Sequence, residues 1–242
     1  MSKKMLKIKT PLIAINFKTY LSATGKNAQT LAKVCAAIAA DRRKSKGASV
    51  LVAVQPTDIA TVAHAIRNSP VLVFAQHIDF IQPGAHTGHI LAQSVKQAGA
   101  IGTLLNHSEH QIPITELSAS IAICKSLGLS TIVCASTVTM ARSVAKLNPD
   151  FVAYEPPELI GGDVSVTTRP QALSRMVKAV RSVNKKVRIL VGAGVKSGVD
   201  VSKALELGTH GVLLASGVAA SKTPIKALID LCSGVSNKVV HK

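Results

Sequence analysis

The chain has 242 residues, enough for one large domain or two small ones, and 47% of them are hydrophobic, which is ample for a buried core. Its 29 Lys and Arg against 12 Asp and Glu give a formal net charge of +17, which predicts attraction to nucleic acid, anionic lipid or phosphorylated metabolites without choosing among them. No apolar run reaches the roughly 18 residues of a membrane span or forms a signal peptide, so we expect a cytoplasmic protein with no membrane partner.

Short runs rich in Val, Ile, Leu and Ala recur along the chain and predict eight strands. These runs cover residues 11–16, 49–53, 71–76, 101–105, 130–135, 151–154, 187–191 and 211–215. They are apolar nearly throughout, which is typical of strands covered on both faces. Helical spacing follows each run, over residues 27–40, 57–67, 90–98, 114–126, 137–147, 170–183, 198–207 and 225–232.

Eight consecutive strand and helix units predict an α/β fold, a (βα)8 barrel. No composition shift or linker marks a boundary, so we expect a single domain over residues 1–242. A doubly wound open sheet is the alternative, although it usually needs fewer units per domain. In a (βα)8 barrel the chemistry belongs at the carboxyl ends of the strands, which directs attention to the polar residues there.

Polar side chains follow the first and fourth predicted strands. Asn16 ends the first, and Lys18 comes two positions later, where it can present its charge to an anionic substrate or simply extend into solvent. His107 follows the fourth strand, with Asn106 or Ser108 as the cap of an expected short helix. The helix dipole there would favour a neutral imidazole that donates a hydrogen bond, although a purely structural capping turn is the alternative.

Glu155 lies where the sixth strand gives way to a segment that can bend. Pro156 and Pro157 come next, followed by Gly161 and Gly162. A carboxylate beside a rigid entry and two flexible glycines indicates a base next to a hinged lid. Exclusion of water by such a lid would raise the basicity of the carboxylate. The alternative is a carboxylate paired with a surface lysine.

Small residues follow the last two strands and predict a phosphate site. Without bulky side chains, backbone N–H groups can approach a ligand closely, and loops after strands seven and eight of a barrel often hold phosphate. These residues are Gly192, Ala193, Gly194, Ala215, Ser216 and Gly217.

Other residue types weaken competing functions. Aromatic residues make up only 2% of the chain, which disfavours a nucleic-acid partner that stacks on aromatic side chains, while duplex binding through phosphates stays open. His77, His86 and His89 lack the helical spacing of a zinc enzyme, so we expect no metal site. The four cysteines form no CxxC pair and are expected to be buried, reduced thiols.

Four motifs lie at or after the ends of predicted strands. In chain order they are NFK at 16–18, GAHTGH at 84–89, NHSEH at 106–110 and YEPPELIG at 154–161. Together they resemble the triosephosphate isomerase family, especially its compact archaeal form, over nearly the whole chain. The resemblance implies interconversion of dihydroxyacetone phosphate and D-glyceraldehyde 3-phosphate, a step of glycolysis and gluconeogenesis, with no metal and no cofactor.

The resemblance also implies roles for individual residues. Glu155 would move the proton between two carbons, and His107 would polarise the carbonyl. Asn16 and Lys18 would stabilise the enediolate and the phosphate charge. Glu109 would help to position the site residues without contacting the substrate itself.

For the phosphate itself, the resemblance implies backbone contacts from Gly161, Gly194, Ala215 and Ser216, beneath a closing lid. The sequence departs from the commoner pattern of the family at three positions. Glu158 replaces a lid Trp, Asp163 replaces a lid Gly, and Gly194 replaces a Ser whose hydroxyl would contact phosphate.

Family members are homodimers or, in the archaeal form, often homotetramers, and the resemblance makes Thr87 the residue that reaches into a partner subunit.

Two other interpretations compete with the isomerase interpretation. Another phosphate-binding barrel enzyme, such as an aldolase or a tryptophan-pathway isomerase, would need a Schiff-base Lys or an Asp/Cys pair that we do not find on the strands. A basic, non-catalytic nucleic-acid binder is the rival from a different class.

Overall fold

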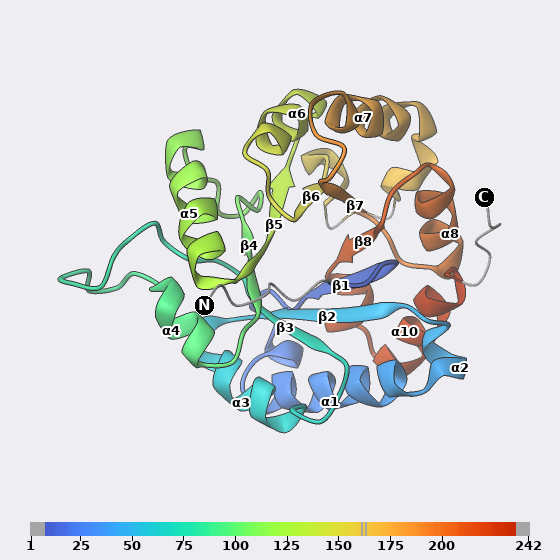
Figure 1. The fold of residues 1–242 in the computed structure, drawn as a ribbon. Helices are drawn as coiled ribbons and strands as arrows, with labels where there is room; N and C mark the ends of the chain where they lie inside the picture. Colours follow the sequence, from blue (N-terminus) through green and yellow to red (C-terminus); the bar gives the residue numbers. More distant parts are fainter. Residues whose placement is uncertain (1–7, 161, 163, 236–242) are drawn as a thin grey trace.

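The computed structural model describes residues 8–160, 162 and 164–235. Eight parallel strands follow one another around a closed barrel, and β8 pairs with β1 to complete it (Figure 1). This confirms the (βα)8 prediction and excludes the open doubly wound sheet. The strands are β1 Leu12–Asn16, β2 Ser49–Val54, β3 Leu72–Ala75, β4 Gly102–Leu105, β5 Ser130–Ala135, β6 Phe151–Tyr154, β7 Arg188–Gly192 and β8 Gly211–Leu214.

Each strand supplies two hydrophobic cores, because successive side chains point to opposite faces. In β1, Leu12 belongs to the cluster inside the barrel, whereas Ile13 packs in the larger cluster beneath the helices. The fully buried rings of Phe74 and Phe151 help to fill the barrel interior. The presence of two cores explains why the strands are apolar at nearly every position rather than at every second one.

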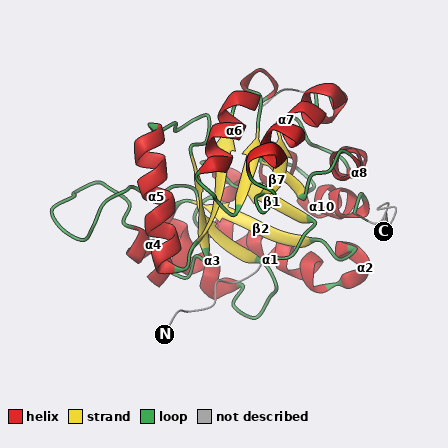
Figure 2. Ribbon diagram, turned by 45° about the horizontal axis from the view of Figure 1, so that its top comes forward, coloured by secondary structure: helices red, strands yellow, loops and turns green. Residues whose placement is uncertain are grey.

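The helices surround the barrel, with the strands at the centre (Figure 2). All eight predicted helices are present, as α1 Lys26–Ala40, α3 Ile59–Ala65, α4 Ala92–Gln97, α5 Ile114–Leu127, α6 Val138–Lys146, α7 Pro170–Val183, α8 Gly198–Glu206 and α10 Pro224–Ser233. Two short helices were not predicted, α2 Arg42–Ser45 and α9 Ser216–Ala219, and neither were the 3-10 turns η1 Leu21–Ala23, η2 Pro56–Asp58, η3 Pro157–Leu159 and η4 Val166–Thr168.

The basic residues from Arg42 onwards form a separate short helix, α2, and do not extend α1. Asp41 separates the two helices because its side chain accepts hydrogen bonds from the backbone N–H groups of Arg43 and Lys44. An aspartate in this capping position satisfies donors that the new helix leaves free.

The four cysteines are free and buried, as predicted. Burial raises the pKa of the Cys35 thiol to about 12, so this thiol stays protonated and unreactive at neutral pH. Within residues 8–160, 162 and 164–235, no helix has the length and apolar character needed to span a bilayer.

Candidate active site

One cavity at the carboxyl end of the barrel collects the predicted site residues from the ends of five different strands. Its wall includes both the proposed catalytic set and the small residues proposed for phosphate. Gly161 lies outside the described residues, but its neighbours Ile160 and Gly162 line the cavity. The site residues on the wall are Asn16, Lys18, His107, Glu155, Gly194, Ala215 and Ser216.

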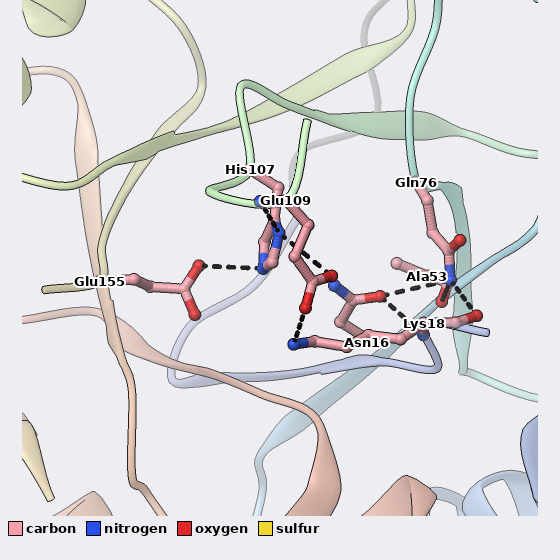
Figure 3. A network of polar contacts seen from close by, with 7 residues as sticks. All are labelled: Asn16, Lys18, Ala53, Gln76, His107, Glu109 and Glu155. Atoms are coloured by element: carbon pink, nitrogen blue, oxygen red, sulfur yellow. Dashed lines mark hydrogen bonds and ion pairs between the residues drawn. The ribbon is translucent and has the colours of Figure 1, made fainter. Parts of the chain in front are cut away.

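Glu155 and His107 face each other across this cavity (Figure 3). Oε2 of Glu155 lies 3.8 Å from Nε2 of His107, and both residues are buried. Oε2 is buried and has no hydrogen-bond partner among the described residues. A buried carboxylate oxygen normally has a partner, so this one is available to a ligand or a transferable proton. The convergence of strands four and six on one cavity is what the sequence predicts.

Burial sets the protonation of Glu155. Loss of solvent raises the pKa of its carboxyl from 4.5 to about 7, against a hydrogen bond from the Cys134 thiol and the charge of Lys18, both of which lower it. The charge of Glu109 adds to the increase. A carboxylate with a pKa near neutrality is suited to both accepting and returning a proton.

His107 is held as a neutral ring with a defined tautomer. The backbone N–H of Glu109 donates to Nδ1 of His107 over 3.2 Å, so the ring proton of the neutral imidazole sits on Nε2, the nitrogen that faces Glu155. Burial, followed by the charge of Lys18, lowers the pKa of His107, while the charge of Glu109 opposes that shift. The ring can therefore donate a hydrogen bond into the cavity.

The sequence predicts a neutral His107 for the wrong reason. No short helix follows β4: residues 106–110 form a turn, and α5 begins only at Ile114. Asn106 does not cap a helix there; its amide donates to the carbonyl of Cys134, and its Oδ1 accepts from the backbone N–H of Ile112. Desolvation replaces the expected helix dipole as the cause.

Lys18 is fixed in an uncommon backbone conformation. Its φ of 48° lies in the left-handed region, which is unusual for a residue other than glycine. Oδ1 of Asn16 accepts the backbone N–H of Lys18 at 2.9 Å, and Nζ of Lys18 pairs with Oε1 of Glu109 at 2.7 Å. Strained residues that surrounding contacts hold in place are common at functional sites.

Gln76, just beyond β3, is a member of this network that the sequence does not reveal (Figure 3). Its Nε2 donates to the carbonyl oxygen of Lys18 at 2.9 Å, to that of Ala53 at 3.2 Å and to Oδ1 of Asn16 at 3.3 Å. It thereby ties the strained loop after β1 to the neighbouring strand β2. A polar residue at the end of a predicted strand was the available signal, but its bonds depend on the three-dimensional spacing.

Two glycines at or just after the end of β7, Gly192 and Gly194, leave space that the site needs. A β-carbon on Gly192 would lie 2.6 Å from Oε1 of Glu155, so any side chain there would displace the carboxylate. Gly194 has a φ of 70°, and a β-carbon on it would overlap the carbonyl of Val164 in the lid segment. The serine expected from the common family pattern would therefore conflict with this lid.

The lid segment is anchored at both ends. Glu158 in η3 accepts a 2.7 Å hydrogen bond from Arg169, which follows η4. Val166 donates its backbone N–H to the carbonyl of Ala193 at 3.1 Å, and Thr167 donates its hydroxyl to Asp200 at 2.8 Å. Glu158 thus has a charged partner in this chain, while Asp163 lies outside the described residues.

A closed (βα)8 barrel with an acid–base carboxylate, a neutral imidazole and glycine-rich loops at the same mouth defines the class of barrel enzymes that handle small phosphorylated substrates. A family model described as triosephosphate isomerase matches residues 11–233. The chain belongs to the triosephosphate isomerase family.

Individual relatives agree with this assignment. A triosephosphate isomerase of Methanobacterium bryantii is 47% identical over 227 residues, covering 93% of this chain and 97% of the relative. One from Methanocaldococcus jannaschii is 43% identical over 221 residues, with 91% and 98% covered. The crystal structure of triosephosphate isomerase from Bartonella henselae aligns with a TM-score of 0.69 at 20% identity, covering 95% of this chain and all of that one, which supports the fold.

Replacement of Gln76 tests the network. Gln76→Ala removes three hydrogen bonds around Asn16 and Lys18. Their loss should weaken transition-state stabilisation by about 1–3 kcal/mol, so we expect kcat/KM for triose phosphate isomerisation to fall roughly 10- to 100-fold. Steady-state kinetics and urea unfolding measure the two effects separately. Gln55→Ala is the matched control, because the Gln55 amide bonds to the Thr24 hydroxyl instead. Equal effects of the two variants would contradict the positioning role.

The pKa of Glu155 predicts a pH-dependent stability cost. The folded chain keeps this carboxyl protonated up to about pH 7, whereas its ordinary value is 4.5, so its contribution to the free energy of unfolding falls as pH rises between those values. The amide of Glu155→Gln does not titrate, so the free energy of unfolding of this variant does not decrease in this way as pH rises. We expect the variant to gain on the order of 2–3 kcal/mol relative to wild type between about pH 5 and pH 8 in urea titrations. Glu116→Gln, in the first turn of α5, should show no such gain; parallel pH profiles for wild type and Glu155→Gln would refute the shift.

Proposed function

We propose that this chain interconverts dihydroxyacetone phosphate and D-glyceraldehyde 3-phosphate by proton transfer through an enediolate. The main observation behind this proposal is that Oε2 of Glu155 has no hydrogen-bond partner among the described residues and lies 3.8 Å from Nε2 of His107, the nitrogen that bears the ring proton. A base and a hydrogen-bond donor thereby point to the same part of the cavity, where they could contact adjacent atoms of one small ligand. That is what moving a proton between two adjacent carbons requires.

In the proposed reaction, the Glu155 carboxylate removes a proton from the hydroxymethyl carbon of dihydroxyacetone phosphate. The electron pair of the broken C–H bond forms the carbon–carbon double bond, and the carbonyl oxygen becomes an enediolate oxygen. His107 Nε2–H and the ammonium of Lys18 stabilise that charge, with Asn16 beside them. The hydroxyl proton on the first carbon passes to the oxygen of the second carbon, a transfer that the His107 imidazole can relay between the two oxygens. The protonated Glu155 returns its proton to that second carbon, and the oxygen on the first carbon becomes the aldehyde carbonyl. The reaction is a net isomerisation and needs no external acceptor of electrons.

We assign the phosphate group to the part of the cavity wall that the small residues after β7 and β8 form. Gly194, Ala215 and Ser216 lie there, and their small size lets main-chain groups approach a dianion. We assign Gly161 to the same group from the sequence. Lys18 adds the positive charge, and its pairing with the exposed side chain of Glu109 leaves the ammonium close to the cavity mouth. We place the reaction in the cytoplasm, where buried free thiols are ordinary.

A coupled assay with glyceraldehyde 3-phosphate on wild type and Glu155→Gln tests the assignment. The amide keeps the shape of the side chain but cannot accept the proton, so kcat should fall about 100- to 10,000-fold while KM changes little. Glu116→Gln is the control, since Glu116 lies in α5 and does not line the cavity. Near-normal turnover by a folded Glu155→Gln variant would remove Glu155 from its role, and an inactive wild type would remove the function.

We further propose that the chain works as a homo-oligomer, a dimer or tetramer, in which Thr87 reaches a partner subunit. Residues 82–89 are all exposed and form a loop between β3 and α4 that projects well beyond the barrel (Figure 1). Next to the active site lies a second hollow, lined by residues that include Lys18, Gln76 and Glu109. A loop from a second copy seated there would contact the network that holds Lys18.

Thr87→Glu should weaken this assembly, because a glutamate that enters the hollow would bring its carboxylate toward Glu109, which lines the hollow. We expect sedimentation velocity to show a smaller species at low micromolar concentration, together with a parallel loss of specific activity. Thr30→Glu, on the exposed face of α1, is the matched control. A wild-type chain that sediments as a fully active monomer would disprove the proposal.

A further inference from the structure

The topology of the barrel gathers basic residues at the end opposite the active site. All eight strands are parallel, so every segment leading from a helix into the next strand lies at the amino-terminal end of the barrel. Eleven exposed Lys and Arg residues lie in these segments or in the last turns of the helices, and exposed Lys9 precedes β1 at the same end of the barrel. We call them the cationic face: Lys9, Arg42, Arg43, Lys44, Lys46, Arg67, Lys96, Lys125, Lys146, Lys185, Lys186 and Lys203.

Few acidic residues offset these charges. In the corresponding segments and last helical turns, the described acids are Asp41, Asp150, Glu206 and Asp230, and Asp230 accepts a hydrogen bond from the backbone N–H of Gly198. Asp41 pairs with two residues of α2, and Asp150 lies 3.9 Å from Arg188. Within the described part of the chain, Lys146, Lys185 and Lys186 have no carboxylate within 4.0 Å. The face therefore carries a large uncompensated positive charge.

Helix electrostatics explains only part of this arrangement. A cation in the last turn of a helix is favoured by the negative end of the dipole, which accounts for Lys125 and Lys146. The effect fades beyond the last turn. Lys185 and Lys186 come after α7 has ended at Val183, and Arg67 comes after α3 has ended at Ala65. Repulsion among such neighbours gives no gain to the isolated barrel.

We propose that the cationic face binds the phosphate backbone of duplex nucleic acid without regard to base sequence. Clustered Lys and Arg on one surface are the footprint of such binding, which gains its free energy by releasing counterions. The described residues place no exposed Phe, Tyr or Trp in these segments, and the exposed ring of His64 is hydrogen-bonded to Arg67, so unpaired bases lack a stacking platform. Backbone contact is the mode that remains for a lysine-rich surface of this kind.

An anionic membrane fits this face less well. Binding to lipid is strengthened when apolar side chains enter the interface beside the charges. The exposed large hydrophobic residues of the described chain all follow strands or begin helices, and none lies on the cationic face: they are Leu21, Phe80, Ile114, Val164, Val199 and Ile225. Because the face and the catalytic cavity lie at opposite ends of the barrel, a polyanion need not block the substrate.

Fluorescence anisotropy of the full-length protein with a random-sequence duplex of about 20 base pairs tests the proposal. The logarithm of affinity should fall linearly with that of salt concentration, with a slope of about −4 or steeper, as expected for four or five neutralised phosphates. The double variant Lys185→Glu, Lys186→Glu should bind at least about tenfold more weakly at a fixed salt concentration and show a slope shallower by about 2.

The matched control is Lys222→Glu with Lys226→Glu, which makes the same change in net charge at exposed positions after β8. It should bind within about twofold of wild type, and isomerase turnover should be unchanged in both double variants. Equal weakening by the two pairs would show that net charge, and not the face, attracts DNA. Failure of wild type to bind duplex, or tighter binding to phosphatidylserine vesicles than to duplex, would overturn the proposal. Neither result would affect the isomerase assignment, which the coupled assay tests separately.

Discussion

The parallel closure of the barrel is the constraint on which the rest of the structure depends. Because β8 pairs with β1 and every strand runs in the same direction, all strands begin at one rim of the barrel and end at the other. Residues distant in sequence, such as Lys18, His107 and Glu155, thereby converge on a single cavity. The same closure sends every helix-to-strand connection to the far rim, so the two ends of one compact body differ in chemistry.

At the active rim, the chain tolerates local costs that a purely structural protein would avoid. Glu155 is buried with one oxygen unpartnered, and Lys18 and Ala193 adopt positive φ angles. Each cost has nearby support. The Cys134 thiol donates to the Glu155 carboxylate, and the amide of Gln76 secures the loop that carries Lys18. The Cys134 support comes from β5, adjacent to β6, and the Gln76 support from the end of β3, two strands away from β1. Several strands therefore hold the geometry of the site.

The sequence predicts the barrel well because its signal is local and repeated: eight apolar runs, each with a helical stretch after it. The residues at the strand ends follow from the same logic, and the meeting of Glu155 with His107 is confirmed at 3.8 Å. Contacts set by distance across strands are not predictable in this way. The three bonds of Gln76, the N–H of Glu109 that fixes the His107 tautomer and the fit of Gly192 against Glu155 belong to that group. The roles of Gly161 and Thr87 remain predictions from resemblance.

The absence of a side chain at Gly194 makes two segments of the chain interdependent. The lid carbonyl of Val164 occupies the space that any larger residue would need, and the lid is fastened next door through Ala193. A protein engineer who introduces a loop with a side chain at this position would have to exchange the lid in the same step. Loop and lid can therefore be swapped between members of the family only as a cassette, and chimaeras that divide them should be poor starting points for design.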